Sequence, residues 1–113
     1  DMKSVKVSFK YKGRKISLNL QPCHNFGIGL MFKSKNTRAL LFDFKGKTRE
    51  AITSFFVFFP FIAIWLDDKN KVLGVKVVKP FRFAIFPKKP FTKLVEIPIN
   101  GNYSKEVALL DED

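Results

Sequence analysis

Apolar and polar side chains alternate at the start of the chain, over residues 5–11 and again over residues 15–20. An alternation with a period of two places one set of side chains on a buried face of a β-strand and the other set in solvent. Between the two stretches stands Lys12-Gly13-Arg14, in which glycine supplies the positive φ of a tight turn. The pattern predicts a hairpin over residues 1–20 with one buried and one cationic face.

The longest apolar run, residues 55–66, lies in the middle of the chain and contains Pro60. A membrane-spanning helix needs about 20 apolar residues, so the run is too short to be one. Because proline cannot donate to a sheet ladder, the run predicts two strands, residues 53–59 and 61–67, each buried on both faces. The turn residues Asp68 and Asn70 then predict a hairpin with a strand over residues 72–78. The central strands, residues 53–78, are expected to organise the fold.

The rest of the chain predicts loops and short strands. Residues 23–29 read as a loop or a short helical turn, and residues 39–44 as a strand. Four prolines within residues 80–98 exclude a helix there, so residues 79–98 are expected to be an extended connection ending in a short strand. A last strand over residues 107–110 precedes an acidic tail, residues 111–113. The chain is therefore predicted to be a single all-β domain, residues 1–113, an antiparallel β-sandwich or distorted barrel with one or two short helical turns.

Four short segments occur in a recognisable order: Gly29-Leu30-Met31-Phe32-Lys33, Leu40-Leu41-Phe42-Asp43-Phe44, Ile64-Trp65-Leu66-Asp67 after Pro60, and Val95-Glu96-Ile97-Pro98 after Lys79-Pro80. In their order and spacing they resemble the domain of unknown function 192 family, from about residue 29 to residue 107. The resemblance implies a compact all-β domain of sandwich type, found in archaea and bacteria, with no established activity.

The chain departs from the family pattern around the proline. Many members have Trp-Met-Lys-Asn-Thr before it and an aspartate two residues after it, whereas the matching positions here, among them Phe55 and Ile62, are apolar. The chain therefore cannot build the polar cluster of its relatives from the same groups. Asp67 and Glu96 are the acidic residues that match the pattern. Lys33 replaces the usual arginine, which keeps the charge and loses the bidentate geometry.

The formal net charge of the chain is +11. A net charge of this size attracts polyanions, and the partner could be nucleic acid, an anionic membrane surface or an acidic protein. The charge could also serve solubility alone. One cysteine, Cys23, excludes an internal disulfide and favours a reducing compartment, so a cytoplasmic location is expected. The chain starts at Asp1 followed by Met2, so an extracytoplasmic domain with a removed leader stays open. The oligomeric state stays open too, with a monomer favoured.

Aromatic and basic residues are interleaved in Phe81-Arg82-Phe83 and again over residues 86–91. Grooves that bind single-stranded nucleic acid use rings to stack bases and cations to hold phosphates. The alternative is that the rings belong to the core and the lysines are solvated, and the abundance of phenylalanine favours it. The candidate binding residues are Arg82, Phe83, Lys88, Lys89, Lys93, Glu96, Asp67 and Lys33.

Catalytic groups are sparse. Cys23 and His24 are adjacent, and neighbours on an extended chain point apart, so neither a nucleophile–base pair nor a metal site is expected. Asp67 is expected to cap a turn, and Glu96, in an apolar strand, to be solvated or paired with Arg82 or Lys93. No catalytic residue, metal or cofactor is predicted.

The leading hypothesis is a non-enzymatic module that binds a ligand or partner through residues 81–93. The alternative is a module that binds single-stranded nucleic acid. The third class, a metal-dependent or Cys/His enzyme, requires that three of Cys23, His24, Asp67 and Glu96 meet in one cleft.

Overall fold

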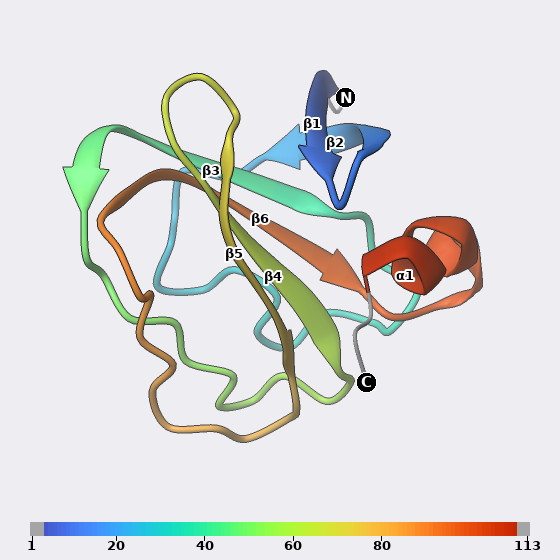
Figure 1. The fold of residues 1–113 in the computed structure, drawn as a ribbon. Helices are drawn as coiled ribbons and strands as arrows, with labels where there is room; N and C mark the ends of the chain where they lie inside the picture. Colours follow the sequence, from blue (N-terminus) through green and yellow to red (C-terminus); the bar gives the residue numbers. More distant parts are fainter. Residues whose placement is uncertain (1–3, 111–113) are drawn as a thin grey trace.

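The computed structural model describes residues 4–110, which form one all-β domain with a short C-terminal helix (Figure 1). This confirms the predicted fold class. The elements are β1 (Val5–Tyr11), β2 (Arg14–Pro22), β3 (Leu40–Thr48), β4 (Phe61–Leu66), β5 (Val72–Val78), β6 (Phe91–Pro98), the 3₁₀ turn η1 (Gly101–Tyr103) and α1 (Ser104–Leu110).

The strands form one curled sheet in the order β1-β2-β3-β6-β4-β5. β1 also contacts β5, so the sheet closes into a half-barrel rather than a two-layered sandwich. All pairs are antiparallel except β2 and β3, which run parallel for two residue pairs at Gln21 and Pro22. A parallel pair needs a long crossover, and residues 23–39 provide it.

The N-terminal hairpin forms as predicted. Its register runs from Val5 opposite Leu20 to Tyr11 opposite Arg14, and its alternate apolar residues enter the core. Both Lys12 (φ 52°) and Gly13 (φ 79°) have positive φ, which is what a two-residue turn between strands requires. The hairpin of β4 and β5 is also confirmed, and every residue of β4 is buried.

The strand predicted over residues 53–59 is wrong. Only Ile52, just before it, makes an isolated bridge, to Ile85, and the following residues form a loop. The backbone N–H of Ser54 donates to the Arg82 carbonyl at 3.0 Å, and Phe56 has a φ of 62°. A chain bent in this way cannot continue a ladder. It turns Val57 and Phe59 inward and Phe58 outward.

The strand predicted over residues 107–110 is wrong as well, because these residues belong to helix α1. The Asn100 side chain caps the preceding turn by accepting the Asn102 N–H at 2.8 Å. The helix then places Leu110 in the core. The acidic tail, residues 111–113, lies outside the described residues.

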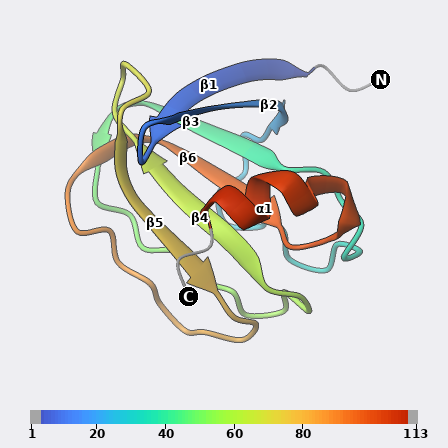
Figure 2. The ribbon, with the colours of Figure 1, turned by 45° about the vertical axis from the view of Figure 1, so that its right-hand side comes forward.

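The sheet has a helix on one face and loops on the other. Helix α1 lies against the face that also packs on the N-terminal hairpin (Figure 2). The opposite face, called the loop face below, is covered by residues 23–39, 49–60 and 79–90, which bury Leu30, Val57, Phe59 and Ile85 against strand residues such as Phe61, Trp65 and Leu94. β6 is therefore covered on both sides.

Candidate functional site

A second set of phenylalanines in the same loops points away from the sheet. Their exposed fractions range from 38% at Phe55 to 80% at Phe83. The prediction that the rings of residues 81–91 belong to the core is wrong for Phe81, Phe83 and Phe86, and it holds for Phe91, which is fully buried. Six of the exposed rings contact one another, and we call them the phenylalanine surface; its members are Phe32, Phe55, Phe56, Phe58, Phe81 and Phe83.

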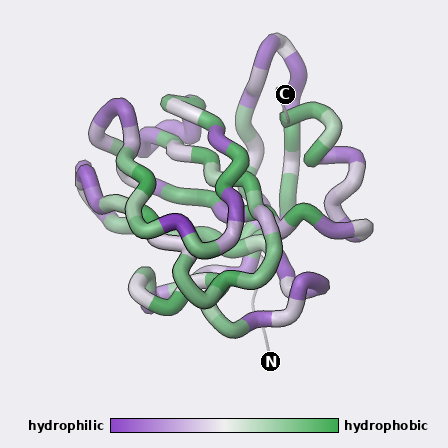
Figure 3. The backbone as a smooth tube through the Cα atoms, turned by 90° about the horizontal axis from the view of Figure 1, so that it is seen from below, coloured by the Kyte–Doolittle hydropathy of each residue, from purple (hydrophilic) through white to green (hydrophobic). Residues whose placement is uncertain are grey.

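The rings of this surface touch one another across the three loops. Phe32 stacks on Phe56 with the ring centroids 5.1 Å apart. Phe58 meets Phe81 edge to face at 5.2 Å, and Phe55 meets Phe83 in the same way at 5.4 Å. Further contacts from Phe55 to Phe56 and to Phe81 connect these pairs. The surface is therefore continuous, at the end of the molecule that Figure 3 faces.

Three of the six phenylalanines have a backbone conformation that bulky residues avoid. The φ angles of Phe32, Phe56 and Phe81 are 62°, 62° and 61°. Such a conformation costs about 1–3 kcal/mol per residue, and it persists only where the surroundings impose it. Here the N–H of Phe32 donates to the Phe56 carbonyl, and the N–H of Phe81 donates to the Ser54 carbonyl, both at 2.9 Å. Local strain is therefore tolerated where the rings face outward.

Ser54 connects two of the loops from beneath. Its side chain is fully buried, and its hydroxyl donates to the Lys79 carbonyl at 2.7 Å and accepts the Arg82 N–H at 2.6 Å. Thr53 adds a hydrogen bond to the Arg82 carbonyl at 3.2 Å. These hydrogen bonds join residues 53–54 to residues 79–82.

The loops are strongly basic. Glu50 is the acidic residue of the three connections, and it stands beside Arg49. The cations are Lys33, Lys35, Arg38, Arg49, Lys79, Arg82, Lys88 and Lys89. The phenylalanine surface is thus set in a positive field.

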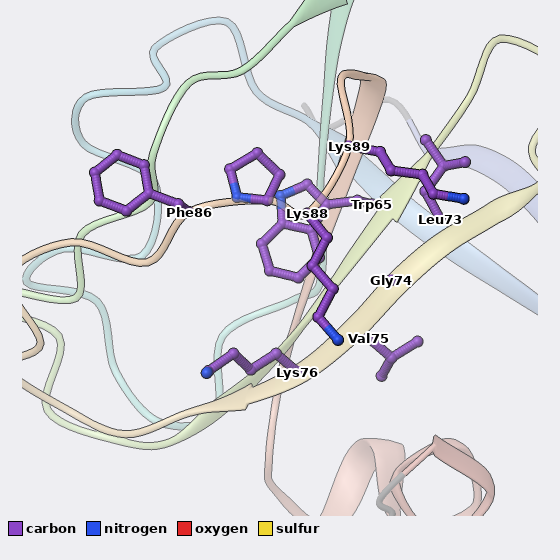
Figure 4. Close-up of a pocket in the computed structure, with 9 residues that line it drawn as sticks. Trp65, Leu73, Gly74, Val75, Lys76, Phe86, Lys88 and Lys89 are labelled. Carbon is purple, nitrogen blue, oxygen red and sulfur yellow. The ribbon is translucent and has the colours of Figure 1, made fainter.

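A pocket of about 280 Å³ lies between β5 and residues 86–89 (Figure 4), and none of the six phenylalanines lines it. Lys88 and Lys89, both predicted as binding residues, line it. The remaining lining residues were not predicted: Trp65, Leu73, Gly74, Val75, Lys76, Phe86 and Pro87. The sequence around Trp65 and around Lys76 contains no pattern that identifies either as a pocket residue. The two residues are brought together by the register of β4 against β5.

Trp65 forms one wall of this pocket. It is 5% exposed, and within residues 4–110 its buried Nε1 has no hydrogen-bond partner. Gly74 stands opposite it in the β4–β5 register. A Cβ atom on Gly74 would lie 3.3 Å from Trp65 Cε3, so glycine allows the β5 backbone to approach the indole closely.

Glu96 lies apart from this pocket, inside the loop face. It is 4% exposed, and its neighbours in the register are Leu40 on β3 and Ala63 on β4. Within the described part of the chain its carboxyl group has no hydrogen bond or ion pair, and burial raises its pKa to about 8. The expectation of pairing with Arg82 or Lys93 is therefore wrong. Burial instead favours the neutral form of the carboxyl group.

Two other predicted residues have structural roles. The Asp67 carboxylate caps the β4–β5 turn by accepting the N–H groups of Lys69 and Lys71, each at 2.8 Å. The hydrogen bond from Lys71 lowers the pKa of Asp67, and the turn interpretation is confirmed. Lys93 Nζ donates to Asn70 Oδ1 at 2.8 Å, at the same end of the sheet.

Arg82, Phe83 and Lys33 lie in the loops that carry the phenylalanine surface. Lys33 follows Phe32 directly, and its N–H donates to the Leu30 carbonyl at 3.1 Å. Lys88 and Lys89 also lie in a connecting loop, beside Leu73 and Gly74 of β5. Five of the eight predicted residues are therefore in the loops: Lys33, Arg82, Phe83, Lys88 and Lys89. Asp67 lies in the β4–β5 turn, and Lys93 and Glu96 lie on β6.

Cys23 and His24 lie at the start of the long crossover. The Cys23 thiol donates to the Asn25 carbonyl at 3.6 Å, within its own loop. Across residues 4–110, no group of three His, Cys, Asp or Glu residues is placed to hold a metal ion. Nor does the described chain contain a helix with the length and apolar character needed to cross a membrane.

Two solved structures share this fold. One is a proposed transcription regulator from Sinorhizobium meliloti 1021, with a TM-score of 0.71 and 15% identity, over 91% of this chain and 84% of that one. The other is a protein of unknown function from Novosphingobium aromaticivorans DSM 12444, with a TM-score of 0.72 and 14% identity, over 90% of this chain and 77% of that one. No family model matches the sequence, and no curated protein matches it significantly. Membership of the domain of unknown function 192 family stays a prediction.

Proposed function

We propose that this domain is a binding module that docks on an anionic lipid surface through the phenylalanine surface. The observation that carries the proposal is the continuous set of six exposed phenylalanines, three of them at positive φ. Burial of one such ring stabilises a complex by about 1.5–3 kcal/mol. A large exposed apolar patch on a small domain typically marks an interaction site.

The ring geometry favours an apolar phase over stacked bases. A base inserted between two rings needs a gap about twice the stacking distance, whereas Phe32 and Phe56 are already in contact. The other neighbouring rings meet edge to face or tilted. The surface therefore has no slot for a base between these paired rings, which disfavours the single-stranded nucleic-acid alternative.

Part of the backbone beneath the rings is hydrogen-bonded within the protein. The N–H groups of Phe32, Phe81 and Arg82 donate to protein oxygens. Backbone groups in the hydrocarbon core of a bilayer must be satisfied internally. These three amides therefore lose no water when the neighbouring side chains insert.

The charge of the loops selects an anionic bilayer over a second copy of the chain. Each Lys or Arg near an anionic membrane contributes about 1 kcal/mol. Two copies placed face to face would instead bring Lys33, Lys79 and Arg82 against their own equivalents. Rings in the centre and cations around them match the layered chemistry of acyl chain and anionic headgroup.

Co-sedimentation with lipid vesicles tests the proposal. The wild type is expected to bind vesicles of phosphatidylcholine with phosphatidylglycerol, and to bind pure phosphatidylcholine far more weakly. The double variant Phe58→Ser, Phe83→Ser should lose about tenfold or more in affinity. Val5→Ser, which removes an exposed apolar residue from β1, should bind as the wild type does.

Absence of binding to the anionic vesicles, or equal binding by the double variant, would overturn the proposal. A parallel titration with fluorescent single-stranded RNA at low and physiological salt addresses the alternative. RNA affinity at physiological salt that depends on Lys88 and Lys89 would support a nucleic-acid module instead.

A further inference from the structure

The wall of the pocket between β5 and residues 86–89 contains a buried hydrogen-bond donor with no acceptor in the described residues. Trp65 Nε1 is buried and unpartnered within the described residues, although buried donors in folded proteins nearly always have an acceptor. In Figure 4 the indole nitrogen is turned towards the loop of residues 86–89, which forms the other side of the pocket. The nitrogen itself is not exposed to the empty pocket, so an oxygen atom of a bound molecule would reach it when the exposed loop of residues 86–89 shifts outward.

The charged groups that line the pocket all have the same sign. They are Lys76 from β5 and Lys88 and Lys89 from the loop, and no carboxylate lines the pocket. Lysine ammonium groups bind phosphate and carboxylate oxygens as point charges. The pocket therefore favours an anion over a neutral or cationic molecule.

The other walls are apolar, and the volume is small. Leu73, Phe86 and Pro87 add apolar side chains beside the charged groups, and Gly74 presents no side chain to the indole. Pockets of about 300 Å³ are at the low end for small-molecule sites. A ligand that fits has one anionic group and a compact apolar part.

We infer that this pocket binds a small organic phosphate or carboxylate, with one ligand oxygen accepting from Trp65 Nε1 and the charge balanced by Lys76 and Lys88. The phosphate could belong to a free metabolite or to a lipid headgroup, since the chemistry is the same. The inference goes beyond the docking function, because the pocket and the phenylalanine surface use different residues.

Intrinsic fluorescence reports on this pocket directly, because Trp65 is the single tryptophan of the chain. Titration with phenyl phosphate should shift the Trp65 emission in a saturable way, and benzyl alcohol should not. The double variant Lys76→Gln, Lys88→Gln should weaken phenyl phosphate by about tenfold or more. The matched double variant Lys6→Gln, Lys105→Gln, which has the same net charge, should bind as the wild type does.

Calorimetry with Trp65→Phe tests the hydrogen bond, since this variant keeps an aromatic ring and loses the donor. It should also bind phenyl phosphate about tenfold more weakly. Phosphatidylglycerol vesicles then distinguish the two sources. A response to vesicles alone that the Lys76→Gln, Lys88→Gln variant loses would support the pocket with a headgroup as its ligand.

Two outcomes would overturn the inference. One is no saturable response to either phenyl phosphate or vesicles. The other is an equal response in the wild type and the Lys76→Gln, Lys88→Gln variant, which would report docking or non-specific binding. The Phe58→Ser, Phe83→Ser variant separates the two proposals, because it should lose vesicle binding and keep phenyl phosphate binding.

Discussion

The buried hydroxyl of Ser54 accepts the backbone N–H of Arg82 at 2.6 Å, and the Ser54 N–H donates to the Arg82 carbonyl at 3.0 Å. This reciprocal pairing joins two loops that are 28 residues apart in the chain. The apolar run after Ser54 would otherwise predict a strand in a sheet. The Ser54–Arg82 hydrogen bonds instead hold two of the loops that carry the phenylalanine surface together.

Ser54→Ala should lower the free energy of unfolding by about 1–3 kcal/mol, because the Arg82 N–H and the Lys79 carbonyl lose a buried partner. Urea denaturation followed by Trp65 fluorescence measures the change. Ser17→Ala, which removes an exposed hydroxyl bonded to Ser8, should change stability by less than about 0.5 kcal/mol. Similar values for both variants would show that the Ser54 pairing adds little.

Phe56→Asn should leave the free energy of unfolding within about 1 kcal/mol of the wild type. Loss of the ring contacts costs about 0.5–1.5 kcal/mol per pair, whereas asparagine tolerates positive φ and releases part of the strain. Phe91→Ala, at a fully buried position, should cost about 3–5 kcal/mol. A Phe56→Asn loss as large as that would mean that the surface serves stability rather than binding.

The raised pKa of Glu96 makes stability depend on pH. Between its ordinary value of 4.5 and about 8, the folded chain binds more protons than the unfolded chain. The free energy of unfolding should therefore fall as pH rises across this window, by about 1.4 kcal/mol per pH unit at most. Below pH 4.5 the Glu96 carboxyl group is protonated in both the folded and the unfolded chain, so it adds no further pH dependence to the free energy of unfolding.

Glu96→Gln should flatten this dependence, since glutamine does not titrate. Urea denaturation at pH 5, 6, 7 and 8 compares the slopes of the two proteins. Glu50→Gln, at an exposed position, should keep the wild-type slope. An unchanged slope in Glu96→Gln would show that the buried carboxyl group does not govern the pH response.

Gly29→Ala should lower the free energy of unfolding by more than about 1 kcal/mol, because the residue has a positive φ of 48°. The added Cβ would also lie 3.4 Å from Glu96 Oε1 and from Phe42 Cζ. Gly46→Ala, where a Cβ meets nothing within 4 Å, is the matched control. Equal denaturation midpoints for the two variants would contradict the expected strain.

Strand prediction succeeded where local pattern and burial coincide. Alternation over residues 5–20 predicted the first hairpin, and the β4–β5 hairpin followed from an apolar run, a turn capped by Asp67 and a second apolar run. Each strand pairs with its neighbour in sequence. The information needed for such a pair lies within about 20 residues of chain.

Prediction failed where apolar content could not distinguish a strand from a loop. Residues 55–59 are as apolar as β4, yet the preceding Ser54 bonds to the loop at residues 79–82 instead of continuing a ladder. Residues 107–110 form a helix whose Leu110 fills the space beside the N-terminal hairpin. Both outcomes depend on partners distant in the sequence.

By itself the sequence determined an all-β domain, its two hairpins and its positive charge, because the periodicity of a strand, the chemistry of a turn and the formal charge are local properties. The tertiary structure alone decided which phenylalanines face solvent, that Glu96 is buried with a raised pKa, and that Trp65, Lys76 and Lys88 line one pocket. These features arise from the register of β4 against β5 and β6 and from three loops packed over one face of the sheet. Burial and convergence are properties of the packed chain, and no single segment encodes them.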